Sequence, residues 1–279
     1  MNSMAKSESS SRIVTSVVAV ISAAALAVSL IAAGFAACAV PDVSTKALAS
    51  AYSTDDASPF TKDELVAAAV QTKHYTIDDN DKAAVYATIA AINAQEALAG
   101  TAGKGAPKID ATANYAAGEL SGEQVAALET AFDAASERYV LTPDAVSHLD
   151  DVFGVVQAAK WWLLAAVVAA CVGCTATAFR GGKRLLGRVL AGAGVSVLAV
   201  LALLAAWLAI DFDGFFAQFH SLFFAAGTWT FSWDSLLICM YPPEFWVGMG
   251  AIWLVVTVAC CVVCITIGRL LRKGSTQKR

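Results

Sequence analysis

Four uninterrupted apolar segments constrain the fold of this chain more than any other feature of its sequence. Each has close to or more than the roughly 20 residues that a helix needs to cross a hydrocarbon core about 30 Å thick. The composition agrees, because 58% of the residues are hydrophobic and only 15% are charged, whereas soluble domains are about one quarter charged. We therefore predict an all-α membrane protein with four transmembrane helices, at residues 13–40, 160–179, 189–210 and 245–268.

The distribution of basic residues predicts the orientation of these helices. Lysine and arginine near the ends of membrane spans favour the cytoplasm. They occur in the N-terminus (1–12), four times in the turn 180–188 and five times in the tail 269–279. Residues 41–159 instead carry 18 acidic and 7 basic side chains. We therefore expect both termini to be cytoplasmic, and residues 41–159 and 211–244 to lie on the outer face.

The first apolar segment has an alternative interpretation as a cleaved signal peptide, because Phe35-Ala36-Ala37-Cys38 resembles a lipoprotein cleavage site. The apolar region of a signal peptide has 7 to 15 residues. This segment is much longer, so we favour an uncleaved transmembrane helix.

The outer segment 41–159 is predicted to form an α-helical cap. Thr61 with Glu64, and Ser121 with Gln124, have the spacing of capping boxes, in which each side chain bonds to a backbone amide of the other residue. A further helix is expected from Asp81 to Leu98. Thr142 and Pro143 are typical of a helix start, and this last helix would continue into the second span, with Gly154 as the expected kink.

The segment from Asp211 to Trp246 is unusually long and aromatic for a connection between two membrane helices. It contains six phenylalanines before Gly227, and three tryptophans. The tryptophans suit an aromatic belt at the lipid headgroups, and the whole segment also suits the wall of a lipid-binding site. We predict such a site at the membrane surface.

Two of the three histidines lie in these outer segments with apolar neighbours. His148 has Asp151 three residues further on, on the same helical face, where a carboxylate can orient the imidazole and leave its other nitrogen free for proton transfer. His220 lies at the start of the aromatic segment. His74 lies in a polar stretch and is expected to be a solvated surface residue.

No pattern in the sequence requires a metal or a soluble cofactor. Cys171 and Cys174, and Cys260, Cys261 and Cys264, would suit a soft metal if they faced one another, but free cysteines in apolar segments usually pack as small hydrophobic residues. A G-x-S-x-G nucleophile motif and a nucleotide-binding loop are both missing from the sequence. We therefore predict no metal, no cofactor and no nucleic-acid partner.

Two stretches of the chain resemble a known family, the bacterial lipoprotein intramolecular transacylases. The first is the run from Thr142 to Val152, which includes His148. The second has the pattern F-H-x-x-F-F followed by W-x-F, and its members are Phe219, His220, Phe223, Phe224, Gly227, Trp229, Phe231, Asp234, Leu236, Pro242, Phe245 and Trp246. The chain departs from the commoner family pattern in its alanine-rich cap and at Ala225 and Ala226.

The resemblance implies an enzyme of the bacterial cytoplasmic membrane. It would move the sn-2 acyl chain of a diacylglyceryl lipoprotein to the α-amine of the lipoprotein's N-terminal cysteine, giving an N-acyl lyso form. The implied acid–base pair is His148 and His220. Expected supporting residues are Asp151, Trp229, Asp234 and Tyr241, and the expected substrate groove contains Phe219, Phe223, Phe224 and Phe231.

Two other functions are compatible with the sequence. One is an acyltransferase or hydrolase that acts on phospholipid with the same histidines. The other is a non-enzymatic sensor or assembly protein of the cell envelope, with four spans and an acidic cap that binds cations or another protein. The sequence does not define the oligomeric state.

Overall fold

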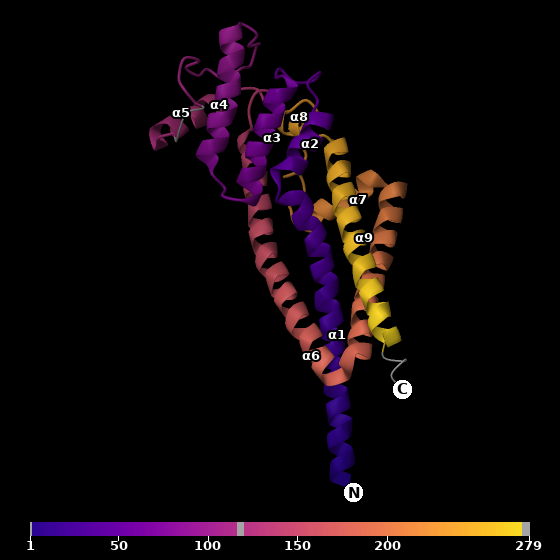
Figure 1. Cartoon of the computed structure of the whole chain (residues 1–279). Coiled ribbons are helices and arrows are strands. Elements are labelled where there is room, and N and C mark those ends of the chain that lie inside the picture. The colour runs from indigo at the N-terminus through magenta and orange to yellow at the C-terminus, as the bar shows by residue number, and fades with distance from the viewer. Residues whose placement is uncertain (1, 116–119, 275–279) are drawn as a thin grey trace. The chain divides into compact units, whose positions relative to one another are not determined.

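The computed structural model describes residues 2–115 and 120–274, and all regular structure in these ranges is helical (Figure 1). The chain divides into two compact units. We call Met1–Ala37, Ala158–Phe215 and Ile252–Arg279 the span unit, and Cys38–Gln157 with Phe216–Ala251 the site unit, because both candidate histidines belong to the latter. The helices are α1 (Asn2–Ala39), α2 (Asp42–Tyr52), α3 (Lys62–Ile77), α4 (Lys82–Ala99), α5 (Gly122–Asp133), α6 (Pro143–Ile210), α7 (Phe212–Ser221), α8 (Leu236–Met240) and α9 (Pro243–Gly274).

Three helices of the described chain are long and apolar enough to cross a membrane, so the protein is a helical membrane protein. They are α1 from Ser11, α6 and α9. Helix α6 has 68 residues, more than three times the roughly 20 that a single span needs. The four-span count and the outer location of residues 41–159 remain predictions.

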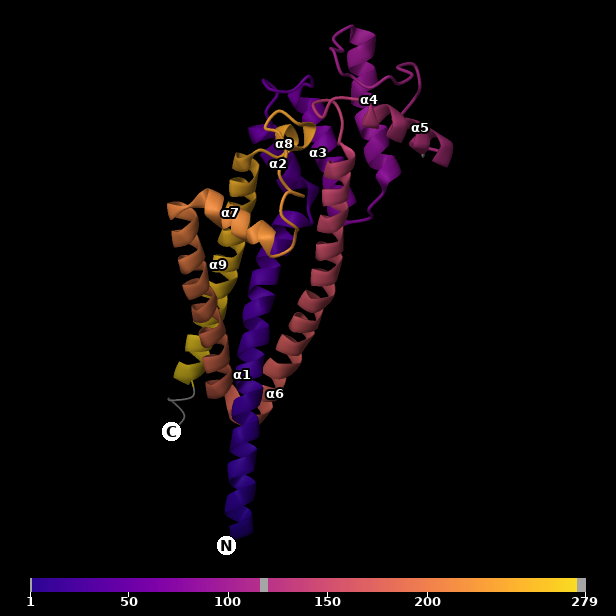
Figure 2. The same cartoon turned by 180° about the vertical axis from the view of Figure 1, so that it is seen from behind.

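Helix α6 is interrupted at Gly182, where φ is 69° and ψ is −179°. Only glycine readily adopts this conformation, and the chain reverses direction here (Figures 1 and 2). The kink that we predicted at Gly154 is wrong, because α6 continues through that residue. Glycine lowers helix propensity by only about 1 kcal/mol, which the long helix around Gly154 tolerates.

The helices of the span unit pack closely. Gly34 of α1 lies against α9, where a methyl group would come within 2.7 Å of the Trp253 carbonyl oxygen and 2.0 Å of Thr257 Oγ1. The Trp253 indole donates a hydrogen bond of 3.1 Å to the Ile31 carbonyl oxygen. Small residues allow such close approach between helices that pack within a membrane.

Local sequence signals define the helices of the site unit. Both predicted capping boxes are present, at Thr61 with Glu64 and at Ser121 with Gln124. The helix that we predicted from Asp81 is α4, and it ends at Gly100 in the left-handed conformation. Helix α3 packs against α2, α4 and α8 (Figure 1).

The second half of the aromatic segment is fixed to this helical core. The Leu236 amide donates to the Glu137 carbonyl oxygen at 2.8 Å, and the Ser232 hydroxyl donates to the Glu137 carboxylate at 2.6 Å. The buried Tyr241 hydroxyl donates to the Ala69 carbonyl oxygen of α3. The core of the site unit therefore determines where the segment lies.

Candidate active site

His148 lies in the second turn of α6, in a part of the helix that is firmly attached to the site unit. Thr142 caps the helix, its hydroxyl oxygen accepting a hydrogen bond of 3.2 Å from the Ala145 amide. Asp150 accepts hydrogen bonds from the Tyr75 hydroxyl and from the Asn80 side chain. These contacts fix the rotation of α6 about its axis, and with it the direction of the His148 ring.

His220 lies near the end of α7, where its backbone surroundings fix the tautomer. His220 Nδ1 is 2.8 Å from the carbonyl oxygen of Phe216, one helical turn earlier. A carbonyl oxygen can only accept a hydrogen bond, so Nδ1 carries the proton. In the neutral ring, Nε2 then has the free lone pair, which is the arrangement that a general base requires.

The two histidines, 72 positions apart in the sequence, come together in the site unit. Their ring centroids are 6.5 Å apart and the ring planes differ by 29°. A proton donor or acceptor of one bound headgroup can therefore reach both rings.

Aromatic side chains surround the pair. Phe224 meets His148 edge to face at a centroid distance of 4.8 Å, and Phe231 lies 5.7 Å from the same ring. Trp229 stacks on His220 at 4.7 Å, with 28° between the planes. The imidazoles are thus partly shielded from water by apolar surfaces.

This environment lowers the pKa of both histidines below the ordinary value. For His148 the main cause is burial, followed by the nearby His220, while the charge of Asp151 acts in the opposite direction. For His220 burial again dominates, and the hydrogen bond to the Phe216 carbonyl partly offsets it. Because an unperturbed histidine titrates near 6.5, both rings are neutral at pH 7.

Two buried polar atoms in this cluster have no hydrogen-bond partner among the described residues. They are His148 Nδ1 and Trp229 Nε1. Leaving a buried polar group unsatisfied costs about 1–3 kcal/mol. Such groups in an aromatic enclosure around a neutral imidazole pair are suited to binding the polar atoms of a substrate.

The structure separates the predicted groove residues into two sets. Phe224 and Phe231 contact His148. Phe219 and Phe223 are about half exposed and contact each other at a centroid distance of 5.4 Å. They border the cluster from outside, because Phe219 also meets His220 edge to face at 5.6 Å and Phe223 lies 6.2 Å from Phe224. Only the first set lines the space beside the His148 ring.

The predicted supporting residues also lie in different places. Trp229 contacts His220 directly, whereas Asp151 influences His148 through its charge. Asp234 forms an ion pair with Arg138 at 3.5 Å. The Tyr241 hydroxyl bonds to α3, in the buried core.

Sequence reasoning missed Phe216. Its ring centroid lies 4.0 Å from that of His220, and its carbonyl oxygen accepts the proton of Nδ1. The signal was present, because a residue four positions before a histidine lies on the same helical face.

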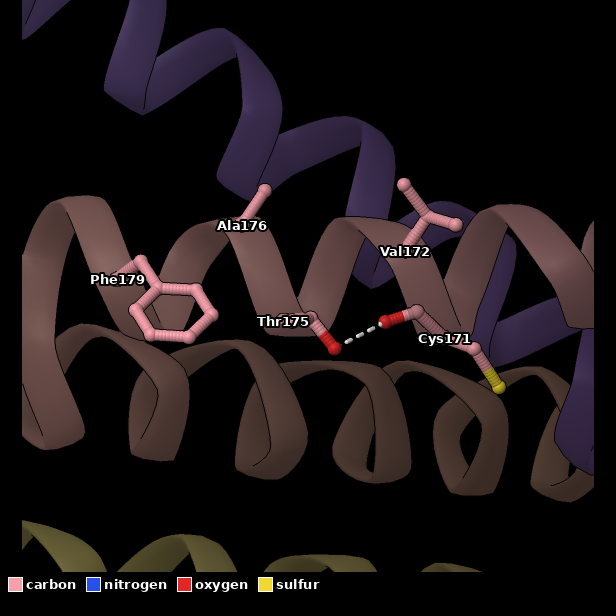
Figure 3. A pocket seen from close by; sticks show the side chains of 5 residues that line it. All are labelled: Cys171, Val172, Thr175, Ala176 and Phe179. Atoms are coloured by element: carbon pink, nitrogen blue, oxygen red, sulfur yellow. Dashed lines mark hydrogen bonds between the residues drawn. The ribbon is translucent and has the colours of Figure 1, made fainter.

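His74 and a surface pocket both lie apart from this cluster. His74, expected to be solvated, is about two-thirds buried, with Nε2 2.9 Å from an Asp42 carboxylate oxygen. An apolar surface pocket lies on α6 in the span unit, where the Thr175 hydroxyl bonds to the Cys171 carbonyl oxygen at 2.8 Å (Figure 3). Its lining includes neither candidate histidine.

The fold and the cluster define a class of protein, a helical membrane protein with a neutral, aromatic-shielded histidine pair. The sequence model of the lipoprotein intramolecular transacylase family, Lit, matches residues 110–246, a range that contains both histidines. This match, which covers 137 of the 279 residues, agrees with the family resemblance that we identified from the sequence. A comparison with curated protein sequences finds no significant match.

Solved structures of a membrane integral lipoprotein intramolecular transacylase, Lit from Bacillus cereus, share the fold. A variant with one histidine replaced by arginine has a TM-score of 0.67 and 15% identity, with 99% of this chain and 100% of that chain covered. A second structure has a TM-score of 0.61 and 14% identity, covering 95% and 98%. A variant with a histidine replaced by alanine has a TM-score of 0.61 and 16% identity, covering 95% and 96%.

Proposed function

We propose that this protein transfers the sn-2 acyl chain of a diacylglyceryl lipoprotein to the α-amine of the lipoprotein's own N-terminal cysteine. The observation that carries the proposal is the pairing of His148 and His220 at 6.5 Å, within a region that matches a family of lipoprotein transacylases. The product is an N-acyl lyso-form lipoprotein.

In the proposed reaction, the amine nitrogen attacks the ester carbonyl carbon. A new C–N bond forms, the bond between the carbonyl carbon and the glycerol oxygen breaks, and one proton moves overall from nitrogen to that oxygen. His220 is the base that accepts the amine proton, because its Nδ1 proton is held by the Phe216 carbonyl and Nε2 is free. The N–H of neutral His148 hydrogen-bonds the oxyanion. The proton taken up by His220 then passes to the unprotonated nitrogen of His148, which delivers it to the departing glycerol oxygen, so both rings return to the neutral state.

The aromatic enclosure favours transfer to the amine over hydrolysis. Exclusion of water from the ester removes the competing nucleophile. Because amine and ester belong to the same molecule, holding them in contact supplies up to about 7–11 kcal/mol through effective molarity. Phe224 and Phe231 exclude water on the His148 side of the pair, and Trp229 does so on the His220 side.

The remaining predicted site residues have supporting roles in this proposal. Asp151 keeps the pKa of His148 from falling further. The pair of Asp234 with Arg138 and the bond from Tyr241 to α3 hold the second half of the aromatic segment in place. The proposal also includes four spans, cytoplasmic termini and a site on the outer face of a bacterial cytoplasmic membrane.

The proposal is tested by expression in a bacterial strain that lacks N-acylation of lipoproteins. Mass spectrometry of a reporter lipoprotein should show conversion of the diacyl form to the N-acyl lyso form. Labelled phospholipid, incubated with the same membranes, should release no fatty acid above the empty-vector level. An unmodified reporter together with phospholipid turnover would replace the proposed reaction by a phospholipid hydrolase.

A further inference from the structure

Helix α7 and the turn that follows it have two apolar faces with different surroundings. Phe216, His220 and Phe224 follow one another at intervals of four residues and contact one another, as residues on one side of a helix do. Phe219, Leu222 and Phe223 have the i, i+3, i+4 spacing of a separate face. We call these three residues the outer lip.

The outer lip is exposed, although all three side chains are large and apolar. The exposed fractions are 49% for Phe219, 69% for Leu222 and 48% for Phe223. Trp233, later in the same segment, is 73% exposed. Clusters of exposed large hydrophobic residues mark surfaces that contact a protein or a membrane.

The charge pattern decides between these two partners. Residues 214–233 contain no aspartate, glutamate, lysine or arginine over 20 positions. Protein interfaces usually have a polar rim and are enriched in arginine, whereas a helix that lies in a membrane interface presents aromatic and aliphatic side chains to lipid. Only three residues separate this segment from the apolar segment that ends at Ile210, so the chain enters it close to a predicted span end.

We infer that the outer lip inserts into the lipid bilayer, at the boundary between headgroups and acyl chains, and that residues 214–233 lie in this boundary rather than in water. The consequence for the reaction rests on the proposed function. A substrate acyl chain passes sideways from the bilayer over Phe219 and Phe223 to the ring of Phe224 beside His148, so the lipid tail stays out of water along the path.

Photochemical labelling from the bilayer tests the insertion without reference to activity. The full chain is reconstituted in nanodiscs that contain a phospholipid with a diazirine in its acyl chain, irradiated, digested with chymotrypsin and mapped by mass spectrometry. Lipid adducts should occur on residues 219–223 at a level comparable to residues 195–210. Peptides around Leu98, 68% exposed in the same unit, should carry none. Adducts on 195–210 without adducts on 219–223 would overturn the inference.

A matched pair of variants tests the consequence for the substrate path. Leu222→Asp places a charge in the lip, and Leu98→Asp places the same charge at an equally exposed leucine outside it. For lipoprotein presented in vesicles, Leu222→Asp should raise KM about fivefold, the factor that corresponds to an interfacial charge cost of about 1 kcal/mol, and Leu98→Asp should leave KM unchanged. Equal KM values for both variants would refute the lateral path. If the wild-type protein carries lipid adducts on residues 219–223 but has no transacylase activity, the inferred insertion stands and the proposed function is rejected.

Discussion

The contact between Phe224 and His148 allows a direct test of how the aromatic enclosure controls proton transfer. Phe224 has the ring nearest to His148 among the described aromatic side chains, at 4.8 Å, and burial is the largest cause of the lowered His148 pKa. Phe224→Ala admits water to one side of the imidazole. The pKa of His148 should then rise towards, and not beyond, its unperturbed value of about 6.5.

The cost of this substitution in stability should be moderate. Full burial of a phenylalanine in a core gives a loss of about 3–5 kcal/mol on truncation, but Phe224 is only partly buried. Its aromatic contacts contribute about 0.5–1.5 kcal/mol beyond burial. We therefore expect a loss of about 1–2 kcal/mol, which leaves the variant folded and measurable.

The assay is transacylation of one lipoprotein substrate by wild type and variant from pH 5 to 8. The α-amine of the substrate titrates near 8, and the ratio of variant to wild-type kcat/KM at each pH cancels that effect. In the proposed mechanism the neutral rings are the working forms. The ratio should therefore fall on acidification from about pH 6.5, where His148 of the variant gains its proton before that of the wild type. Phe223→Ala, which removes a more exposed neighbouring ring, should give a ratio independent of pH. A flat ratio for Phe224→Ala in folded protein would refute the assigned role of burial.

Four further substitutions test separate parts of the structure. Asp151→Asn removes a charge that raises the pKa of His148, so its rate relative to wild type should increase as the pH falls below 6.5; a decrease would contradict the electrostatic assignment. Tyr241→Phe removes a buried hydrogen bond and should lower the free energy of unfolding by about 1–3 kcal/mol, and an unchanged melting temperature would exclude the anchoring role. Gly154→Ala should stabilise α6 by about 0.5–1 kcal/mol, whereas Gly182→Ala should destabilise the folded protein by about 1–3 kcal/mol. Equal melting temperatures of the two variants would contradict the different backbone roles of the two glycines.

Sequence signals that act over one helical turn predicted the structure well. The capping boxes at Thr61 and Ser121 depend on bonds between residues three positions apart, and both are present. The break in α6 could not be assigned in the same way. Gly154 and Gly182 are both glycines in long helical stretches, and only tertiary packing decides which one adopts a positive φ.

The candidate site could also be predicted only in part, because its geometry depends on tertiary packing. The residue types of the cluster were identified from the sequence, but their positions depend on how α7 is rotated about its axis. That rotation directs Phe224 towards His148 and Phe219 to the surface, although both belong to one aromatic motif. The link between Tyr241 and Ala69 spans 172 positions, and no periodicity in a single sequence reports such a contact.

Histidine substitution in cells tests the central claim, that one pair of imidazoles carries the reaction. A reporter lipoprotein is analysed by mass spectrometry after expression of His148→Ala, His220→Ala, the double variant, and His74→Ala as the matched control. Each site substitution should lower the yield of the N-acyl lyso form by about 100-fold or more, the double variant should be little worse than either single variant because the rings act as a unit, and His74→Ala should retain wild-type conversion. Wild-type yields from a correctly inserted His148→Ala or His220→Ala protein would contradict the account.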